Sequence, residues 1–325
     1  MLTTFLQNLV FGLQLGSEYA LIALGYTMVY GVLRLINFAH GDVWMVGGYI
    51  AIFFIRAMML HHGWGPSWSL FTATILLCML GCGALGFIIE RLAYRPLRKA
   101  PRLAALITAI GVSLLIENVG QLQQVFGTEP QTCPAVLPGG DPKYTGLTIG
   151  PTLLGMHMHR MHVDFHGVIV LRSHIIFLGA SLILLGILWY VVSYTKLGRA
   201  MRAVAFDQDA ASLMGVNSNS IVSFTFFIGS ALAGAAGFMT AALIQLPFKP
   251  ISGIIPGLKA FTAAVIGGIG NIPGAAVGGF LMGIIEAMVA HSTGGLKDAV
   301  AFAVLILVLL VRPTGLFGKG VVEKV

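Results

Sequence analysis

Charged residues are scarce in this chain. Only 10% of its 325 residues are Asp, Glu, Lys or Arg, whereas 57% are hydrophobic. A soluble domain cannot bury so much apolar surface while leaving so few charges for its exterior. The composition therefore excludes an ordinary soluble protein and indicates several membrane spans of about 20 apolar residues each. No basic segment precedes the first apolar run, so we expect that run to be a retained span rather than a signal peptide.

Cysteines and catalytic motifs are also few. Cys78 and Cys82 lie one helical turn apart in an apolar run and Cys133 stands alone, which argues against a disulfide framework or a Cys-based metal site. The patterns G-x-x-x-x-G-K-[ST], G-x-S-x-G and H-E-x-x-H are absent. A G-x-G-x-x-G at 81–86 has no strand before it, so helix packing explains it better than dinucleotide binding. We expect no enzymatic activity and no cofactor bound by this chain.

What the sequence does contain is a series of long apolar runs. They cover 5–33, 43–60, 70–90, 103–126, 175–194, 221–246, 257–290 and 298–312. No alternating pattern predicts strands, and no linker leads to a soluble domain. We predict a single all-α, polytopic membrane domain over residues 1–325, with about eight to ten transmembrane helices, some of them discontinuous or re-entrant.

The basic residues are grouped beside the apolar runs. The net charge of +7 comes with three clusters, whose members are Arg91, Arg95, Arg98, Lys99 and Arg102; Lys196, Arg199 and Arg202; and Arg312, Lys319 and Lys324. This distribution follows the positive-inside rule and argues against a nucleic-acid partner. We therefore predict cytoplasmic loops at 91–102 and 195–220 and an extracytoplasmic loop at 127–174.

The third cluster creates a parity problem. Three apolar segments separate it from the second cluster, an odd number that would place the two on opposite sides of the membrane. The stretch 260–285 is uncharged but rich in helix-weakening residues: Gly267, Gly268, Gly270, Pro273, Gly274, Gly278 and Gly279. Such a stretch predicts a re-entrant or discontinuous helix, or two short helices, in place of one straight span.

A corresponding irregularity lies at 37–48, where polar residues and glycines follow the first apolar run. Irregular backbone at membrane depth is tolerated only where protein or a water-filled cavity satisfies it. Paired breaks in two halves of a chain are typical of a transport pathway. The candidates for lining such a pathway are Asn37, His40, Asp42, Gly267, Gly268, Gly270 and Pro273.

The polar candidates have two readings. Asn37, His40 and Asp42 either face an interior cavity or lie in water at a span end, where Asp42 would cap the next helix. For Glu18 the alternatives are a functional role on one side and a subunit contact or cavity lining on the other. Close packing of helices, combined with a break, explains the glycines of 267–279 better than a ligand-binding loop does.

Four motifs carry a resemblance to a known family. They are "GSEYALIALGYTMVYGVLRLINFAHGDVWMVGGY", "KLGRAMRAVAFDQDAASLMGVNSNSI", "LKAFTAAVIGGIGNIPGAAVGGFLMGIIEAM" and "LILVLLVRPTGLFG". In this order they resemble the branched-chain amino-acid ABC transporter permeases of the LivH type. The resemblance covers nearly the whole chain except the polar loop at about 127–174.

The resemblance implies a subunit of an importer in the bacterial inner membrane. Its implied partners are a second, related permease, two cytoplasmic ATP-binding subunits that hydrolyse ATP, a periplasmic substrate-binding protein and membrane lipid. It also implies a coupling loop that contacts the ATPases. The coupling candidates are Gly198, Arg199, Arg202, Asp209, Ala210, Ala211 and Gly215, with Asp209 in place of the usual Glu and the usual Leu-Pro absent.

One polar tract lies outside these motifs. The loop segment "GMHMHRMHVDFH" contains His157, His159, His162 and His166, residues typical of zinc or copper sites. A solvated loop is the simpler interpretation, and these histidines are weak metal candidates.

Three alternative functions stay open at this point. The first is a permease of the same family for urea, another amide or other amino acids. The second is an ion-gradient transporter, for which only Glu18, Glu117 and Glu286 are available as intramembrane acids. The third is a membrane enzyme, which the missing motifs disfavour.

Overall fold

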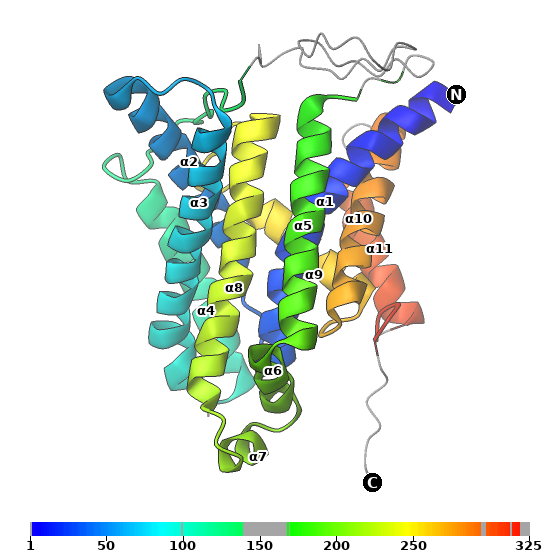
Figure 1. Ribbon diagram of the computed structural model, residues 1–325. Helices are drawn as coiled ribbons and strands as arrows, with labels where there is room; N and C mark the ends of the chain where they lie inside the picture. Colours follow the sequence, from blue (N-terminus) through cyan, green and yellow to red (C-terminus); the bar gives the residue numbers. More distant parts are fainter. Residues whose placement is uncertain are drawn as a thin grey trace.

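The computed structural model describes residues 2–98, 100–138, 168, 170–293, 297–312 and 314–318. In these residues the protein is a helical bundle (Figure 1). Its α-helices are α1 (Leu2–Leu33), α2 (His40–His62), α3 (Trp68–Ile89), α4 (Arg102–Gly120), α5 (Arg172–Tyr194), α6 (Lys196–Phe206), α7 (Gln208–Leu213), α8 (Ser218–Met239), α9 (Ile254–Gly267), α10 (Ile272–Thr293) and α11 (Lys297–Val311).

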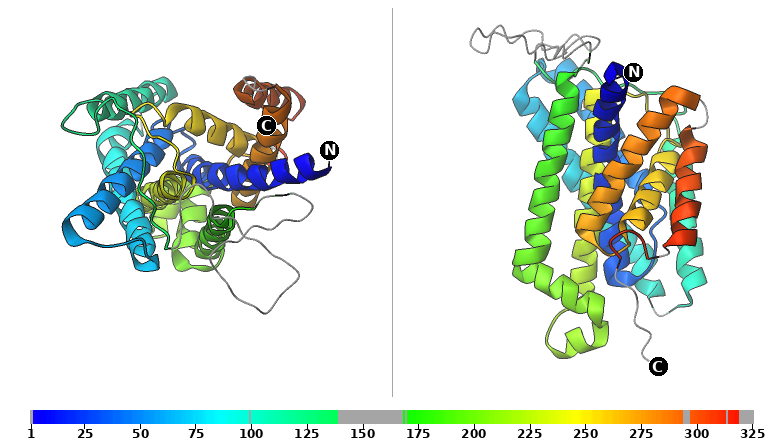
Figure 2. Two further views of the ribbon diagram at one scale, coloured as in Figure 1. Left: turned by 90° about the horizontal axis from the view of Figure 1, so that it is seen from above. Right: turned by 90° about the vertical axis from the view of Figure 1, so that its right-hand side faces the viewer.

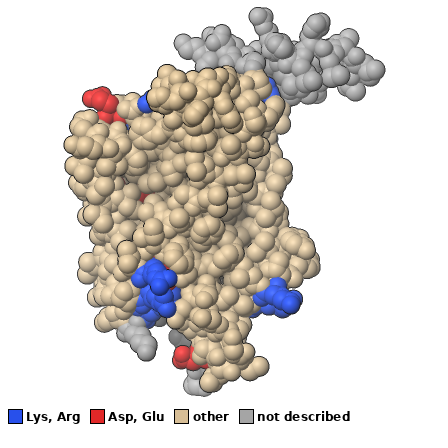
Figure 3. Space-filling model, turned by 60° about the vertical axis from the view of Figure 1, so that its left-hand side comes forward, with Lys and Arg blue, Asp and Glu red and all other residues tan. Residues whose placement is uncertain are grey.

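Seven of the described helices are long and apolar enough to cross a membrane, and α9 and α11 are shorter apolar helices. An α-helix satisfies its own backbone groups, which is what an apolar bilayer requires of a spanning segment. The prediction of an all-α, multi-pass membrane protein is therefore confirmed. Figure 3 agrees with it: on the face shown, Lys and Arg gather near the lower end, below a wide uncharged band.

Helix boundaries differ slightly from the apolar runs. The run 103–126 is not one helix, since α4 ends at Gly120 and residues 121–126 form turns. There the Phe126 ring stacks on Tyr49 of α2 with a centroid distance of 4.0 Å. Aromatic packing against α2 thus accounts for an apolar turn that hydropathy alone cannot distinguish from a helix.

Glycines let the central helices approach closely. A Cβ at Gly283 of α10 would lie 2.1 Å from the backbone nitrogen of Gly16 in α1. A Cβ at Gly237 of α8 would lie 2.0 Å from the Trp44 carbonyl oxygen in α2. Gly86, from the G-x-G-x-x-G pattern, faces Ser230 of α8. This is small-residue packing of membrane helices, as predicted for that pattern.

The predicted break after α8 is confirmed. α9 ends at Gly267, Gly268 and Gly270 have φ values of +97° and +93°, and α10 begins at Ile272. Since positive φ is accessible mainly to glycine, this turn reverses the chain in four residues. α8 to α11 therefore run in alternating directions, and α11 runs back toward the end of the bundle that carries α6 and α7 (Figures 1 and 2). The break thus resolves the parity problem.

Two long helices end in π-helical turns. Glu90–Tyr94 follows α3 and Thr240–Ile244 follows α8. π-turns leave the regular α-helical hydrogen-bonding pattern and are frequent at functional sites. The first lies near α6 and α7, and the second lies at the opposite end of the bundle (Figure 1).

Candidate functional site

The polar segment after α1 is buried inside the protein. Asn37, His40 and Asp42 are only 2%, 1% and 1% exposed. The Tyr94 hydroxyl donates a hydrogen bond of 3.0 Å to Asn37 Oδ1. This placement supports the interior reading of the three residues and not a water-exposed span end.

His40 opens α2 and packs on α1. A Cβ at Gly25 would lie 2.1 Å from His40 Nε2, so only glycine leaves room for the imidazole there. The ring also meets Tyr26 edge-on at a centroid distance of 4.9 Å. His40 is therefore fitted between α1 and α2 by its neighbours.

Asp42 does not cap its helix, contrary to the span-end reading. No side chain caps the N-terminus of α2, and Asp42 Oδ2 instead accepts a 2.5 Å hydrogen bond from the Ser113 hydroxyl of α4. Asp42 and Glu117 line a cavity of about 200 Å³ between α2, α4 and α9. Two carboxyl groups thus line one cavity, a placement that sequence spacing did not predict.

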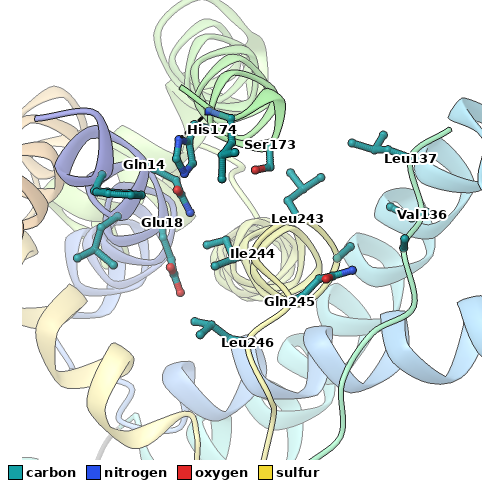
Figure 4. A pocket seen from close by; sticks show the side chains of 15 residues that line it. Gln14, Glu18, Val136, Leu137, Ser173, His174, Leu243, Ile244, Gln245 and Leu246 are labelled. Carbon is teal, nitrogen blue, oxygen red and sulfur yellow. Dashed lines mark hydrogen bonds between the residues drawn. The ribbon is translucent and has the colours of Figure 1, made fainter. Parts of the chain in front are cut away.

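A larger cavity of about 390 Å³ lies between α1, the start of α5 and the end of α8 (Figure 4). Its lining residues are Phe11, Gln14, Leu15, Glu18, Ala135, Val136, Leu137, Leu171, Ser173, His174, Ala242, Leu243, Ile244, Gln245 and Leu246. Glu18 is only 3% exposed and is directed toward the turn that carries Ile244 (Figure 4). Glu18 therefore lines this cavity, one of the alternatives given for it.

A buried ionic cluster lies next to this cavity. Lys259 Nζ of α9 is 2.6 Å from both Glu286 Oε1 of α10 and Asp298 Oδ1 of α11. The Tyr19 hydroxyl of α1 donates to Glu286 Oε2 at 2.8 Å. The sequence analysis missed Lys259, although a lone lysine in the run 257–290 is the signal that could have identified it.

The glycines of the break between α9 and α10 allow close packing of the two helices. A Cβ at Gly267 would lie 2.1 Å from the Gly274 carbonyl oxygen. The segment 314–318 lies against the same turn, where Leu316 donates its N–H to Ile266 and the Asn271 amide donates to the Phe317 carbonyl oxygen at 2.9 Å. Gly267, Gly268, Gly270 and Pro273 line neither of the two cavities described above.

The predicted coupling loop forms a compact projection, α6 and α7, at the lower end of the bundle (Figure 1). Asp207 Oδ1 caps α7 by accepting hydrogen bonds of 2.9 Å from the N–H groups of Asp209 and Ala210. Ala211 is buried, whereas Gly215 follows α7 with φ +83°. The short helix ending near a glycine is thus present, although its cap is Asp207, a residue the sequence analysis did not single out.

The remaining coupling candidates hold α6 to α5. A Cβ at Gly198 would lie 2.1 Å from the Val192 carbonyl oxygen, and Arg202 donates a hydrogen bond to that same oxygen. Arg199 donates its backbone N–H to Thr195. These contacts fix the angle at which the projection leaves the bundle.

Comparisons with known proteins agree with this architecture. Residues 8–309 match the family model described as "Branched-chain amino acid transport system / permease component". The chain belongs to this permease family. It is 42% identical to the high-affinity branched-chain amino acid transport system permease protein LivH of Escherichia coli strain K12 over 322 residues, which cover 99% of this chain and 98% of LivH. It is 43% identical to the corresponding permease protein BraD of Pseudomonas aeruginosa over 326 residues, with the same coverage. No solved structure matches the chain.

In this permease the α6–α7 projection carries exposed apolar side chains that the motifs did not predict. Phe206, Leu213 and Met214 are 89%, 88% and 84% exposed. They lie at the end of the bundle where Lys and Arg gather, beyond the apolar band (Figures 1 and 3). Apolar side chains that project this far from the bundle are available for contact with another protein.

A group of hydrogen-bonded polar side chains joins the end of α3 to the start of α8. Glu90 is fully buried and accepts hydrogen bonds from Arg98 and, at 2.5 Å, from the Ser223 hydroxyl. Arg98 also donates to Asn219 Oδ1 at 2.6 Å. The π-helical turn after α3 is thus joined to the first turns of α8, directly after α7.

The candidate metal ligands His157, His159, His162 and His166 lie outside the described residues. Among the residues that the structure does describe, no group of three or more His, Cys, Asp or Glu side chains is arranged to hold a metal ion.

Proposed function

We propose that this chain is a membrane subunit of an ATP-driven importer for leucine, isoleucine and valine in a bacterial inner membrane. It pairs with a second, related permease to form the pathway. Two cytoplasmic subunits hydrolyse ATP, and a periplasmic binding protein delivers the substrate. The chain itself binds no cofactor.

The α6–α7 projection is the observation that carries this proposal. It is compact, it is capped by Asp207, and it exposes the apolar side chains of Phe206, Leu213 and Met214. It lies at the basic end of the bundle. A gradient-driven transporter working alone has no need of such a docking surface, whereas an ABC permease needs one to receive the motion of its ATPases. The names printed for the relatives support branched-chain amino acids as the substrates.

Uptake measurements test the proposal. Labelled leucine and labelled urea are offered to cells that lack the chain and to cells that carry it again on a plasmid. We expect leucine uptake to fall and to be restored, while urea uptake stays unchanged. Loss of urea uptake alone would change the substrate within the same family, and no change in either would contradict transport of both compounds.

A further inference from the structure

We propose that the 390 Å³ cavity between α1, α5 and α8 is a transient binding site for the zwitterionic substrate, with Glu18 receiving its ammonium group. This inference rests on the proposed function and goes beyond it by assigning a site and a residue. α8 begins beside α7 and ends at the opposite end of the bundle, where it lines the cavity (Figure 1). If α7 is on the cytoplasmic side, as the proposed function requires, the cavity is at the extracytoplasmic end.

The size and lining of the cavity suit a small aliphatic amino acid. Its volume lies within the range of about 300–1,000 Å³ that small-molecule sites occupy. Leu137, Leu243, Ile244 and Leu246 supply apolar walls from two different segments. A branched side chain can be received by such walls without a directional contact, which suits a site that must also release its ligand.

The neighbouring ionic cluster does not supply Glu18 with a bonded cation. Among the described residues, the carboxyl groups of Glu286 and Asp298 contact the Lys259 ammonium group, and Glu18 interacts electrostatically with the same cluster. Lys259 is already bonded to Glu286 and Asp298, and no lysine or arginine is among the described residues that line the cavity. Glu18 has a hydrogen-bond partner in Thr240 but no cation bonded to it among the described residues. A ligand with a positive group beside Glu18 would compensate the buried carboxylate further.

The other end of the zwitterion has a favourable partner as well. Leu171, Ser173 and His174 belong to the N-terminus of α5, a helix of 23 residues, and they line the cavity. The N–H groups of Leu171 and His174 are hydrogen-bonded within this turn, but the positive dipole end of the helix still favours a carboxylate. Glu18 and Ser173 reach the cavity from different helices (Figure 4), so opposite charges of one ligand find separate partners.

Cysteine protection tests the assignment in the whole transporter, in right-side-out membrane vesicles. Leu246→Cys and, on another wall, Leu137→Cys are labelled with a membrane-impermeant thiol reagent, with the unmodified chain as background. We expect leucine to slow labelling about tenfold at about ten times its dissociation constant. We expect 3-methylbutylamine, which keeps the ammonium group, to protect partially, and 4-methylpentanoate, which lacks it, to give no protection.

Charge removal at Glu18 completes the test. Glu18→Gln keeps the side-chain size, and we expect it to abolish protection by leucine while labelling without ligand is unchanged. Glu129→Gln, an identical change at an exposed loop position, should preserve protection. Equal protection by leucine and 4-methylpentanoate, full protection in Glu18→Gln, or no labelling at either cysteine would overturn the assignment.

The proposed function is judged separately by leucine uptake in the unmodified chain. If uptake depends on the chain and protection is absent, the cavity assignment alone is wrong. If uptake does not depend on the chain, the proposed function is wrong.

Discussion

Gly283 of α10 and Gly16 of α1 show how single residues set the bundle. Their backbones touch, so the space that a methyl group would need is taken by the other helix. Gly179 of α5, in contrast, has no atom within 4 Å of the position where its Cβ would lie. The same residue type therefore has opposite roles at the two positions.

We expect Gly283→Ala to destabilise the protein, because a Cβ there overlaps backbone that cannot rotate away. Overpacking of this kind typically costs about 1–3 kcal/mol. Gly179→Ala should leave stability unchanged or raise it by about 0.5–1 kcal/mol, since alanine is the better helix former. Thermal unfolding of the detergent-purified variants measures both, and a Gly283→Ala variant as stable as Gly179→Ala would contradict the close packing.

Lys259 is the basic residue of the buried ionic cluster with Glu286 and Asp298. We expect Lys259→Met to destabilise the protein by about 3–5 kcal/mol, because the buried Glu286 carboxylate loses its ammonium partner. Lys249→Met, the same change at an exposed position, should shift stability by less than about 0.5 kcal/mol.

A double variant separates this electrostatic cause from lost packing. Lys259→Met with Glu286→Gln removes both charges, and we expect it to recover part of the lost stability. A double variant no more stable than Lys259→Met would show that the lysine acts through packing alone.

At the scale of elements, the geometry of two short connectors depends on glycine. The α9–α10 turn depends on positive φ at Gly268 and Gly270, and the loop after α7 depends on it at Gly215. The α6–α7 projection therefore depends on two local features: the Asp207 cap at the start of α7 and the positive φ of Gly215 after its end.

We expect Gly215→Val to uncouple ATP hydrolysis from transport, and Asp209→Asn to do so more weakly. A residue other than glycine at φ +83° is strained, by roughly 1–2 kcal/mol, so the end of α7 must shift. The readout is the number of ATP molecules hydrolysed per leucine taken up. Gly63→Val places the same strain at φ +64° after α2, away from the projection, and should leave this ratio unchanged. An unchanged ratio in Gly215→Val and Asp209→Asn would contradict the coupling role.

At the scale of the whole molecule, much of the architecture could be predicted from the sequence. Long apolar runs identify spans because a bilayer admits few backbone solutions. The odd number of apolar runs between two basic clusters indicated a break within 260–285, and the chain does turn at Gly268 and Gly270. The contacts of Asp42 with Ser113 and of Glu90 with Ser223 could not be predicted, because they join segments far apart in the sequence. The same holds for the cavity that the π-helical turn at 240–244 helps to line. No local periodicity encodes those pairs.

Transport in proteoliposomes tests the central claim most directly. The permease pair, the two ATPases and the binding protein are reconstituted with ATP on the ATPase side, and leucine uptake is compared with uptake driven by an imposed proton gradient without ATP. The account predicts leucine accumulation with ATP alone and none with the gradient alone. Accumulation with the gradient in the absence of ATP would contradict it and would establish an ion-driven transporter instead.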